Sequence, residues 1–138
     1  MQNHNIELLS PAGDFERLKL AVKFGADAVY VGGEQFGMRT NPSNFSADEL
    51  KSAVELVHSE NKKLYLTCNT LPRNNEIEAL PDYLKYAAQI GVDALIIADM
   101  GVLALAKRYS YVNSGRYRQL CKRKRALRYG SFKNSDRS

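Results

Sequence analysis

The stretch GADAVYVGG at residues 25–33 decides the fold class. A glycine and an aspartate stand ahead of Ala28 to Val31, which have the composition of a buried strand, and two glycines close the stretch. Residues 91–95, GVDAL, repeat this order of glycine, aspartate and apolar strand. Two explanations stay open for the repeat. It is either the same turn chemistry arising twice between a helix and a strand, or the repeating unit of a (β/α) barrel.

Outward from these segments, the sequence alternates strands with helices. Apolar runs predict strands at residues 6–9, 28–31, 63–68 and 94–98, and an amphipathic or apolar helical pattern follows each of them. The predicted helix caps are Asp14, Ser46 with Glu49, and Asp99. Such alternation implies an α/β fold with parallel strands and right-handed crossovers. Since a closed barrel needs eight units, the chain holds either half a barrel or a small open sheet, and periodicity does not choose.

Composition places the chain among globular proteins of one domain. Its 138 residues are 44% hydrophobic and 25% charged, which excludes a wholly disordered, collagenous or coiled-coil protein. We expect no membrane association, because no apolar run reaches the ~18 residues of a membrane span. The N-terminus also lacks the pattern of a secretory signal. Two cysteines, Cys68 and Cys121, cannot form a disulfide framework, so a cytoplasmic location is expected.

The formal net charge of +5 averages two unlike parts. Residues 1–115 carry 11 basic and 14 acidic side chains, whereas residues 116–138 carry 9 basic side chains and one acidic. We therefore divide the chain into a partial barrel, residues 1–110, and a basic irregular tail, residues 111–138. The tail is expected to be disordered or non-native, since charge runs usually remain solvated. The alternative is an RNA-binding tail, because its arginines and lysines lie near Tyr117 and Tyr129.

Several ordered segments resemble one known family. They are ELLSPAGDFE at residues 7–16, GADAVYVGG at 25–33, FGMR at 36–39, NF at 44–45, NTL at 69–71 and GVDALIIAD at 91–99. Together they resemble the N-terminal part of the peptidase U32 family, the collagenase-like proteases. The resemblance covers residues 6 to about 110. It implies that the chain forms the N-terminal half, about four βα units, of a TIM-type (β/α) barrel.

The resemblance also implies a choice of activities. Members are peptidases, some of which degrade collagen or gelatin, while other branches take part in hydroxylating RNA nucleobases or ubiquinone. Those branches carry an iron–sulfur cluster on four cysteines beyond the segment represented here. Neither Cys68 nor Cys121 matches that pattern, so we expect no cofactor in this chain, and no histidine or cysteine spacing predicts a metal site. We expect the N-terminal fragment of a protease that is inactive alone, with peptide or RNA as the substrate of the longer protein. The alternatives are an RNA-hydroxylation fragment and a basic-tailed RNA-binding module.

After Ser110 the sequence departs from the family, which continues with a Ser-Thr-Gln segment. The residues from Tyr111 onward are polar and basic instead. Because the charge changes at the same point, we expect a frameshift or a premature end there. Sequencing the encoding DNA tests this expectation: it fails if no shifted frame near codon 111 restores the Ser-Thr-Gln strand.

The candidate site residues follow the predicted strands, because chemistry in a (β/α) barrel lies at the C-terminal ends of the strands. Asn69 and Asp99 are the candidate catalytic residues. Asn69 is suited to orienting a substrate carbonyl, or to tying the loop backbone together. Asp99 is suited to general acid–base chemistry, although an N-cap is the role that aspartate favours at such a position.

Arg39, Arg73 and Glu7 are the candidate substrate-binding residues. The two arginines are suited to holding a carboxylate by forked hydrogen bonds, or lie in solvent. Glu7 is predicted to pair with an arginine inside the barrel or to lie at its rim, because an unpaired buried carboxylate is costly. As a partial barrel has open strand edges, we also expect marginal stability and self-association through those edges.

Overall fold

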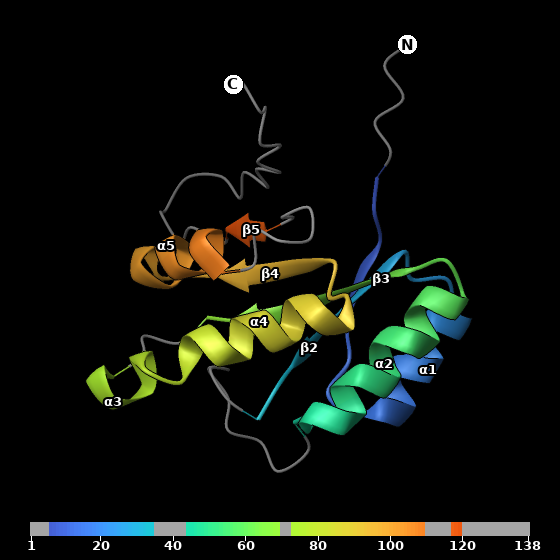
Figure 1. The fold of residues 1–138 in the computed structure, drawn as a ribbon. Coiled ribbons are helices and arrows are strands. Elements are labelled where there is room, and N and C mark those ends of the chain that lie inside the picture. The colour runs from blue at the N-terminus through green and yellow to red at the C-terminus, as the bar shows by residue number, and fades with distance from the viewer. Residues whose placement is uncertain (1–5, 35–43, 70–72, 110–116, 120–138) are drawn as a thin grey trace.

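The computed structural model describes residues 6–34, 44–69, 73–109 and 117–119, which form the fold in Figure 1. A parallel sheet lies at its centre, with five strands side by side in chain order. The strands are β1 (Leu9–Pro11), β2 (Ala28–Gly32), β3 (Lys63–Cys68), β4 (Ala94–Ile97) and β5 (Tyr117–Gln119). The helices are α1 (Phe15–Lys23), α2 (Ala47–Ser59), α3 (Asn74–Ile77), α4 (Leu80–Ile90) and α5 (Met100–Tyr109). The predicted alternation of strands and helices is confirmed.

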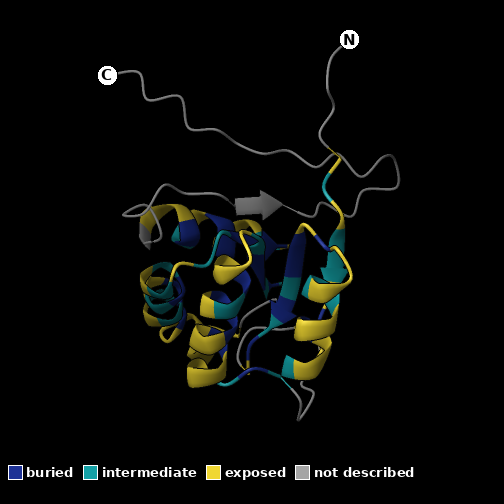
Figure 2. Cartoon of the chain, turned by 90° about the vertical axis from the view of Figure 1, so that its right-hand side faces the viewer, coloured by how far each residue is buried: buried dark blue, intermediate teal, exposed yellow. Residues whose placement is uncertain are grey.

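The two faces of the sheet have different coverings. Alternate strand residues such as Val29, Leu64 and Leu95 belong to one large cluster with the buried side chains of α1, α2, α4 and α5. Residues of the opposite face, including Ala28, Tyr65 and Ala94, form a smaller cluster to which no described helix contributes. Figure 2 shows the buried strands behind helices whose outer faces are exposed. A doubly wound sheet carries helices on both faces, so helices on one face and strands in chain order indicate part of a (β/α) barrel.

The helix boundaries follow the capping residues that the sequence predicts. Asp14 Oδ1 accepts the Arg17 N–H at 2.8 Å, and this bond begins α1. Ser46 and Glu49 form the predicted capping box, in which each side chain accepts the backbone N–H of the other residue. These bonds satisfy N–H groups that the first turn of a helix leaves without partners, so the caps fix where α1 and α2 start.

The repeated Gly-x-Asp motif joins each unit to the strand beside it. Gly25 and Gly91 take the left-handed backbone conformation, with φ of 98° and 89°, and so end the preceding helices. Asp27 Oδ2 then accepts the Leu8 N–H at 2.8 Å, and Asp93 Oδ2 accepts the Leu64 N–H at 2.8 Å. In both cases the aspartate N–H donates to the carbonyl of the same leucine, at 2.9 Å. The repeat is therefore one structural device used at equivalent places in two βα units.

The structure differs from the predicted elements in three places. β1 spans Leu9–Pro11 rather than residues 6–9, because Leu8 bonds to the turn at Asp27. The segment predicted as a loop between β3 and α4 contains the short helix α3. Three residues of the predicted irregular tail form β5, which pairs in parallel with β4. The remaining tail residues, 111–116 and 120–138, lie outside the described residues. Within the described chain, no helix has the length and apolar character needed to span a membrane.

Candidate functional site

The C-terminal ends of β3 and β4 bring together two of the predicted site residues. Asn69 follows Cys68, the last residue of β3, and Asp99 comes two residues after the end of β4. Because Cys68 and Ile97 are paired across these neighbouring parallel strands, both side chains belong to the same edge of the sheet. A half-buried amide and a half-buried carboxylate therefore lie at the end where (β/α) barrels hold their chemistry.

Asp99 caps the helix that follows it, as the sequence predicts. Its Oδ2 accepts the Val102 N–H at 3.0 Å, and its backbone carbonyl accepts the Leu103 N–H at 3.0 Å. Gly101 allows this arrangement, since a Cβ at that position would stand 2.9 Å from Asp99 Oδ2. Within the described residues Oδ1 of Asp99 accepts no hydrogen bond. The cap thus fixes the carboxylate in place at the start of α5.

Thr67 and Asn44 also lie at this edge, although neither is among the candidate site residues predicted from the sequence. Thr67 Oγ1 donates to the Val31 carbonyl at 3.2 Å, which ties β3 to β2 one residue before β2 ends. A side chain at Gly32 would stand 3.5 Å from both Thr67 Oγ1 and Asn44 Oδ1. The Thr67 hydroxyl and the Asn44 side-chain oxygen thus both lie near the end of β2. Asn44 belongs to the NF segment of the family resemblance, which is the signal that pointed toward it.

The predicted arginines do not join this group in the described structure. Arg73 stands at the start of α3, where its backbone N–H donates to Glu76 Oε2 at 2.8 Å and its side chain is exposed. Arg39 lies outside the described residues. Substrate binding by either arginine stays a prediction.

Glu7 lies at the opposite end of the strands. Its carboxylate accepts the Tyr65 hydroxyl at 2.6 Å and lies 3.8 Å from Lys63 Nζ. Lys63 is the first residue of β3, so Glu7 stands at the N-terminal ends of the strands, whereas Asn69 and Asp99 stand at the C-terminal ends. The partners described for it are thus a tyrosine and a lysine, and it is separated from Asn69 and Asp99.

Cys68 faces the helical layer rather than the site. Its side chain is fully buried, and burial raises the pKa of the thiol to about 12. The thiol therefore stays protonated at neutral pH and behaves as a small apolar group. Tyr83 of α4 is close to it, and burial raises the pKa of its hydroxyl as well.

The described residues form neither a metal centre nor an iron–sulfur site. No three His, Cys, Asp or Glu side chains of the described segments gather closely enough to hold a metal ion. Cys68 is buried alone in the core, and Cys121 lies outside the described residues. The donor set of the described chain thus does not fit an iron–sulfur cluster.

A separate cavity of about 330 Å³ lies in the helical layer between α2 and α4. Aromatic side chains line much of it, including Phe45, Tyr83 and Tyr86, with the carboxylates of Glu34 and Asp82 at its border. Tyr86 bridges the two helices, because its hydroxyl donates to the Ala47 carbonyl at 2.7 Å. Glu34 follows the end of β2 and Tyr83 reaches Gly33, so this cavity adjoins the C-terminal end of β2, although neither Asn69 nor Asp99 is among its lining residues.

Comparisons with known proteins agree on one family. The sequence profile of peptidase family U32 matches residues 13–114. A protein of Methanocaldococcus jannaschii named as an uncharacterized protease is 43% identical over 101 residues, which are 73% of this chain and 25% of that protein. The 23S rRNA 5-hydroxycytidine C2501 synthase of Escherichia coli is 42% identical over 105 residues, 76% of this chain and 16% of that protein. The tRNA hydroxylation protein P1 of Bacillus subtilis is 40% identical over 102 residues, 74% of this chain and 24% of that protein.

A solved structure supports the fold independently. The structure of a U32 peptidase superposes with a TM-score of 0.63 at 15% identity, covering 83% of this chain and 49% of the other. Against the three sequence relatives, the chain spans about a quarter of their length or less. The half-barrel arrangement and the profile match over most of the chain lead to the same conclusion: this chain belongs to peptidase family U32.

Proposed function

We propose that this chain forms the RNA-binding first half of the barrel in a U32 protein of the RNA-hydroxylation branch. The observation that carries the proposal is the identity of 40–42% to two relatives named for hydroxylation of tRNA and rRNA. The family match over residues 13–114 includes both strand ends that carry Asn69 and Asp99. The role proposed for the chain is to bind and orient a nucleobase, while the oxygen transfer itself belongs to groups outside the described residues.

The side chains at the C-terminal edge suit the edge of a base. An amide such as Asn69 both donates and accepts hydrogen bonds, and a carboxylate such as Asp99 accepts from an exocyclic amine. Single-stranded RNA is recognised through these edges when its bases are unstacked. Fixing Asp99 by its bonds to α5 supports this role, because a preorganised acceptor loses little freedom when the base binds.

Peptide hydrolysis is the second candidate function. It is favoured by the relative of 43% identity that is named as a protease. In that case Asp99 would act as the general base that activates water, and Asn69 would orient the scissile carbonyl. Both candidates use the same two residues, so the substrate rather than the site must distinguish them.

Nucleoside analysis of cellular RNA tests the proposal. Total tRNA and rRNA from the source organism are digested and compared by mass spectrometry with RNA from a strain lacking the gene. We expect a hydroxylated pyrimidine nucleoside to disappear and to return when the wild-type gene is restored. Asp99→Asn and Asn69→Ala should each restore about a fifth of it or less, if each removes a base contact worth about 1–3 kcal/mol.

Two features make the experiment decisive. Asn is as good an N-cap as Asp, so Asp99→Asn removes the charge while keeping the start of α5. Glu55→Gln, a loss of charge on the exposed face of α2, is the matched control and should restore the nucleoside fully. Unchanged RNA, together with gelatin cleavage that Asp99→Asn abolishes, contradicts the proposal and supports the peptidase.

A further inference from the structure

The cavity between α2 and α4 combines an aromatic interior with a negatively charged opening. Its volume of about 330 Å³ lies at the small end of the range for sites that bind small molecules. Phe45 and Leu50 are 3% and 2% exposed and form its floor. Glu34 and Asp82 are exposed and stand at its border. A ligand that enters the cavity therefore passes between carboxylates and comes to lie against aromatic rings.

Tyr86 bridges the two helices that flank the cavity. Its hydroxyl donates to the Ala47 carbonyl at 2.7 Å, so the side chain reaches from α4 to the first residue of α2. Tyr83, one helical turn earlier on α4, contributes a second ring to the lining. Apart from the two carboxylates, the other lining side chains are a phenylalanine, a leucine and two alanines. The interior thus presents mainly carbon to a ligand.

The carboxylates at the border are accessible to a ligand. Lys85 Nζ lies 4.0 Å from Asp82 Oδ1, but the Asp82 side chain is 89% exposed, so this ion pair contributes little. Glu34 forms no ion pair within the described chain. Two carboxylates at one opening attract a cation and repel the phosphates of a nucleic acid. The charge therefore favours a cation over a segment of RNA as the occupant.

We propose that this cavity binds a small quaternary ammonium ion. The faces of aromatic rings attract such a cation, most strongly where water is excluded. A quaternary nitrogen has no N–H group, so it enters an interior of carbon without losing a hydrogen bond to water. A primary ammonium or a guanidinium group would lose several hydrogen bonds there. Neither Asn69 nor Asp99 lines the cavity, so this site is independent of the proposed function.

Three related ligands test the proposal. Choline carries a trimethylammonium group, its neutral isostere dimethylbutanol has carbon in place of the nitrogen, and ethanolamine carries a primary ammonium instead. Each is titrated into the isotopically labelled 138-residue chain and followed by NMR. Choline should shift the amide signals of Ala47 and Ala79, which lie at the starts of α2 and α4, with a Kd on the order of 1 mM. The other two ligands should bind about tenfold more weakly or less, because each lacks one of the two properties that the cavity selects.

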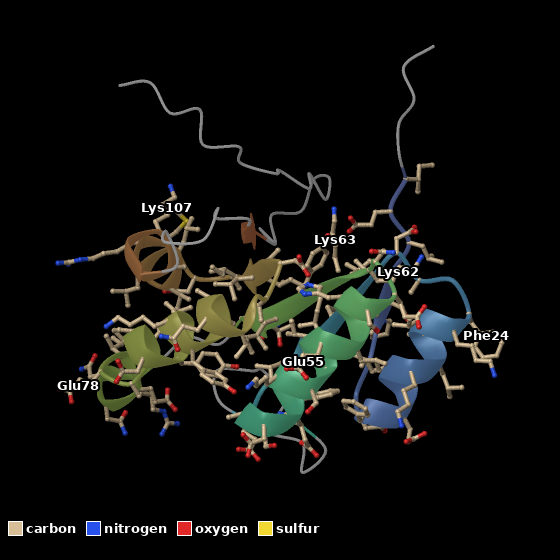
Figure 3. The ribbon with its side chains drawn as sticks, turned by 45° about the vertical axis from the view of Figure 1, so that its right-hand side comes forward. Phe24, Glu55, Lys62, Lys63, Glu78 and Lys107 are labelled. Carbon is tan, nitrogen blue, oxygen red and sulfur yellow. The ribbon has the colours of Figure 1, made fainter. Side chains whose placement is uncertain are left out.

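Variants of the lining show which groups supply the binding. Glu34→Gln combined with Asp82→Asn should weaken choline binding by about threefold or more and narrow the difference between choline and dimethylbutanol. Tyr86→Leu removes a ring and should also weaken choline binding by about threefold or more. Tyr86→Phe loses only the bond to Ala47 and should bind choline nearly as well as the wild type. Glu55→Gln is the matched control for charge, because Glu55 is exposed midway along α2 (Figure 3) and outside the lining, and it should change nothing.

The carboxylate variants keep the test independent of folding, because both side chains are exposed and the amide spectrum reports whether each variant is folded. Choline that leaves the Ala47 and Ala79 signals unmoved overturns the proposal. Dimethylbutanol that binds as tightly as choline would show a pocket that selects apolar shape without charge, and ethanolamine that binds as tightly would exclude selection of the quaternary group. Choline binding that survives both the carboxylate changes and Tyr86→Leu would likewise contradict the site.

Discussion

The hydroxyl oxygen of Tyr83 lies too close to the Cα of Gly33 for a Cβ to fit between them. Tyr83 belongs to α4 and Gly33 follows the last residue of β2, so the ring reaches from the helical layer to the end of the strand. Only glycine fits under the hydroxyl. This contact couples the packing of α4 to the edge of the sheet that carries the candidate site.

The first prediction concerns this contact. Gly33→Ala should lower the free energy of unfolding by about 1–3 kcal/mol, because the rigid tyrosine ring must move to admit the methyl group. In a Tyr83→Phe background the cost should fall by about half or more, since the obstructing oxygen is gone. Urea unfolding of the four proteins in this cycle measures the coupling. Gly32→Ala is the control and should be nearly neutral, because its Cβ would meet its neighbours at 3.5 Å.

A second prediction compares the two aspartates of the repeated turn. Asp93 Oδ2 receives the Leu64 N–H at 2.8 Å and lies 2.7 Å from His58 Nε2, and its side chain is 23% exposed. Asp27 accepts the Leu8 N–H and is 49% exposed. We expect Asp93→Ala to cost about 2–3 kcal/mol and Asp27→Ala about 1 kcal/mol, since an unpaired N–H is more costly where water is excluded. Equal losses in thermal or urea unfolding would contradict this ranking.

The buried thiol gives a third prediction, for chemical modification. Iodoacetamide at pH 8 should leave Cys68 unmodified in the folded chain and modify it completely in urea, because both burial and the protonated state protect the sulfur. Peptide mass mapping assigns the modified cysteine. Rapid modification of Cys68 in the folded chain would show that the strand opens readily at this position.

The Cys68 thiol also leads to a prediction of how the stability of the fold changes at alkaline pH. The Cys68 pKa rises from 9.0 to about 12 on folding, so the unfolded chain releases the thiol proton at lower pH than the folded chain. This contribution to stability is complete below pH 9 and is lost as the pH rises above 9, with a slope of at most about 1.4 kcal/mol per pH unit. Cys68→Ala should remove this slope between about pH 9 and 10, where urea unfolding can be measured before tyrosines ionise.

A fourth prediction concerns the clamp at the other end of the strands. Tyr65→Phe removes the hydroxyl that donates to Glu7, and we expect it to cost about 1–3 kcal/mol. Glu7→Gln keeps an acceptor for that hydroxyl and should cost less than Tyr65→Phe. If thermal unfolding shows Glu7→Gln to be the more damaging change, the ion pair with Lys63 rather than the tyrosine bond holds this end of the sheet.

The sequence was informative where one residue and its near neighbours decide the geometry. The caps at Asp14, Ser46 and Asp99 involve backbone groups three residues away, so a short stretch of sequence is enough to predict them. The left-handed turns at Gly25 and Gly91 follow for the same reason. These local features fix the order of the elements, from which the parallel sheet follows.

Long-range pairings were beyond such reasoning. Glu7 finds Tyr65 at a separation of 58 residues, and the tyrosine at position 83 reaches Gly33 across two layers. Nothing in the neighbourhood of either residue specifies its partner. Strand order is enough to place Asn69 and Asp99 at one edge, whereas the position of Asn44 beside Thr67 depends on side-chain packing.

The chain order of the strands has a consequence for biosynthesis. From β1 to β4, each strand pairs with the strand 19 to 35 residues before it, and the Gly-x-Asp turns at β2 and β4 fasten the new strand to that neighbour as soon as it emerges. No segment in this series must wait for a partner that the ribosome has yet to make. The half-barrel can therefore assemble vectorially, one βα unit at a time, during translation.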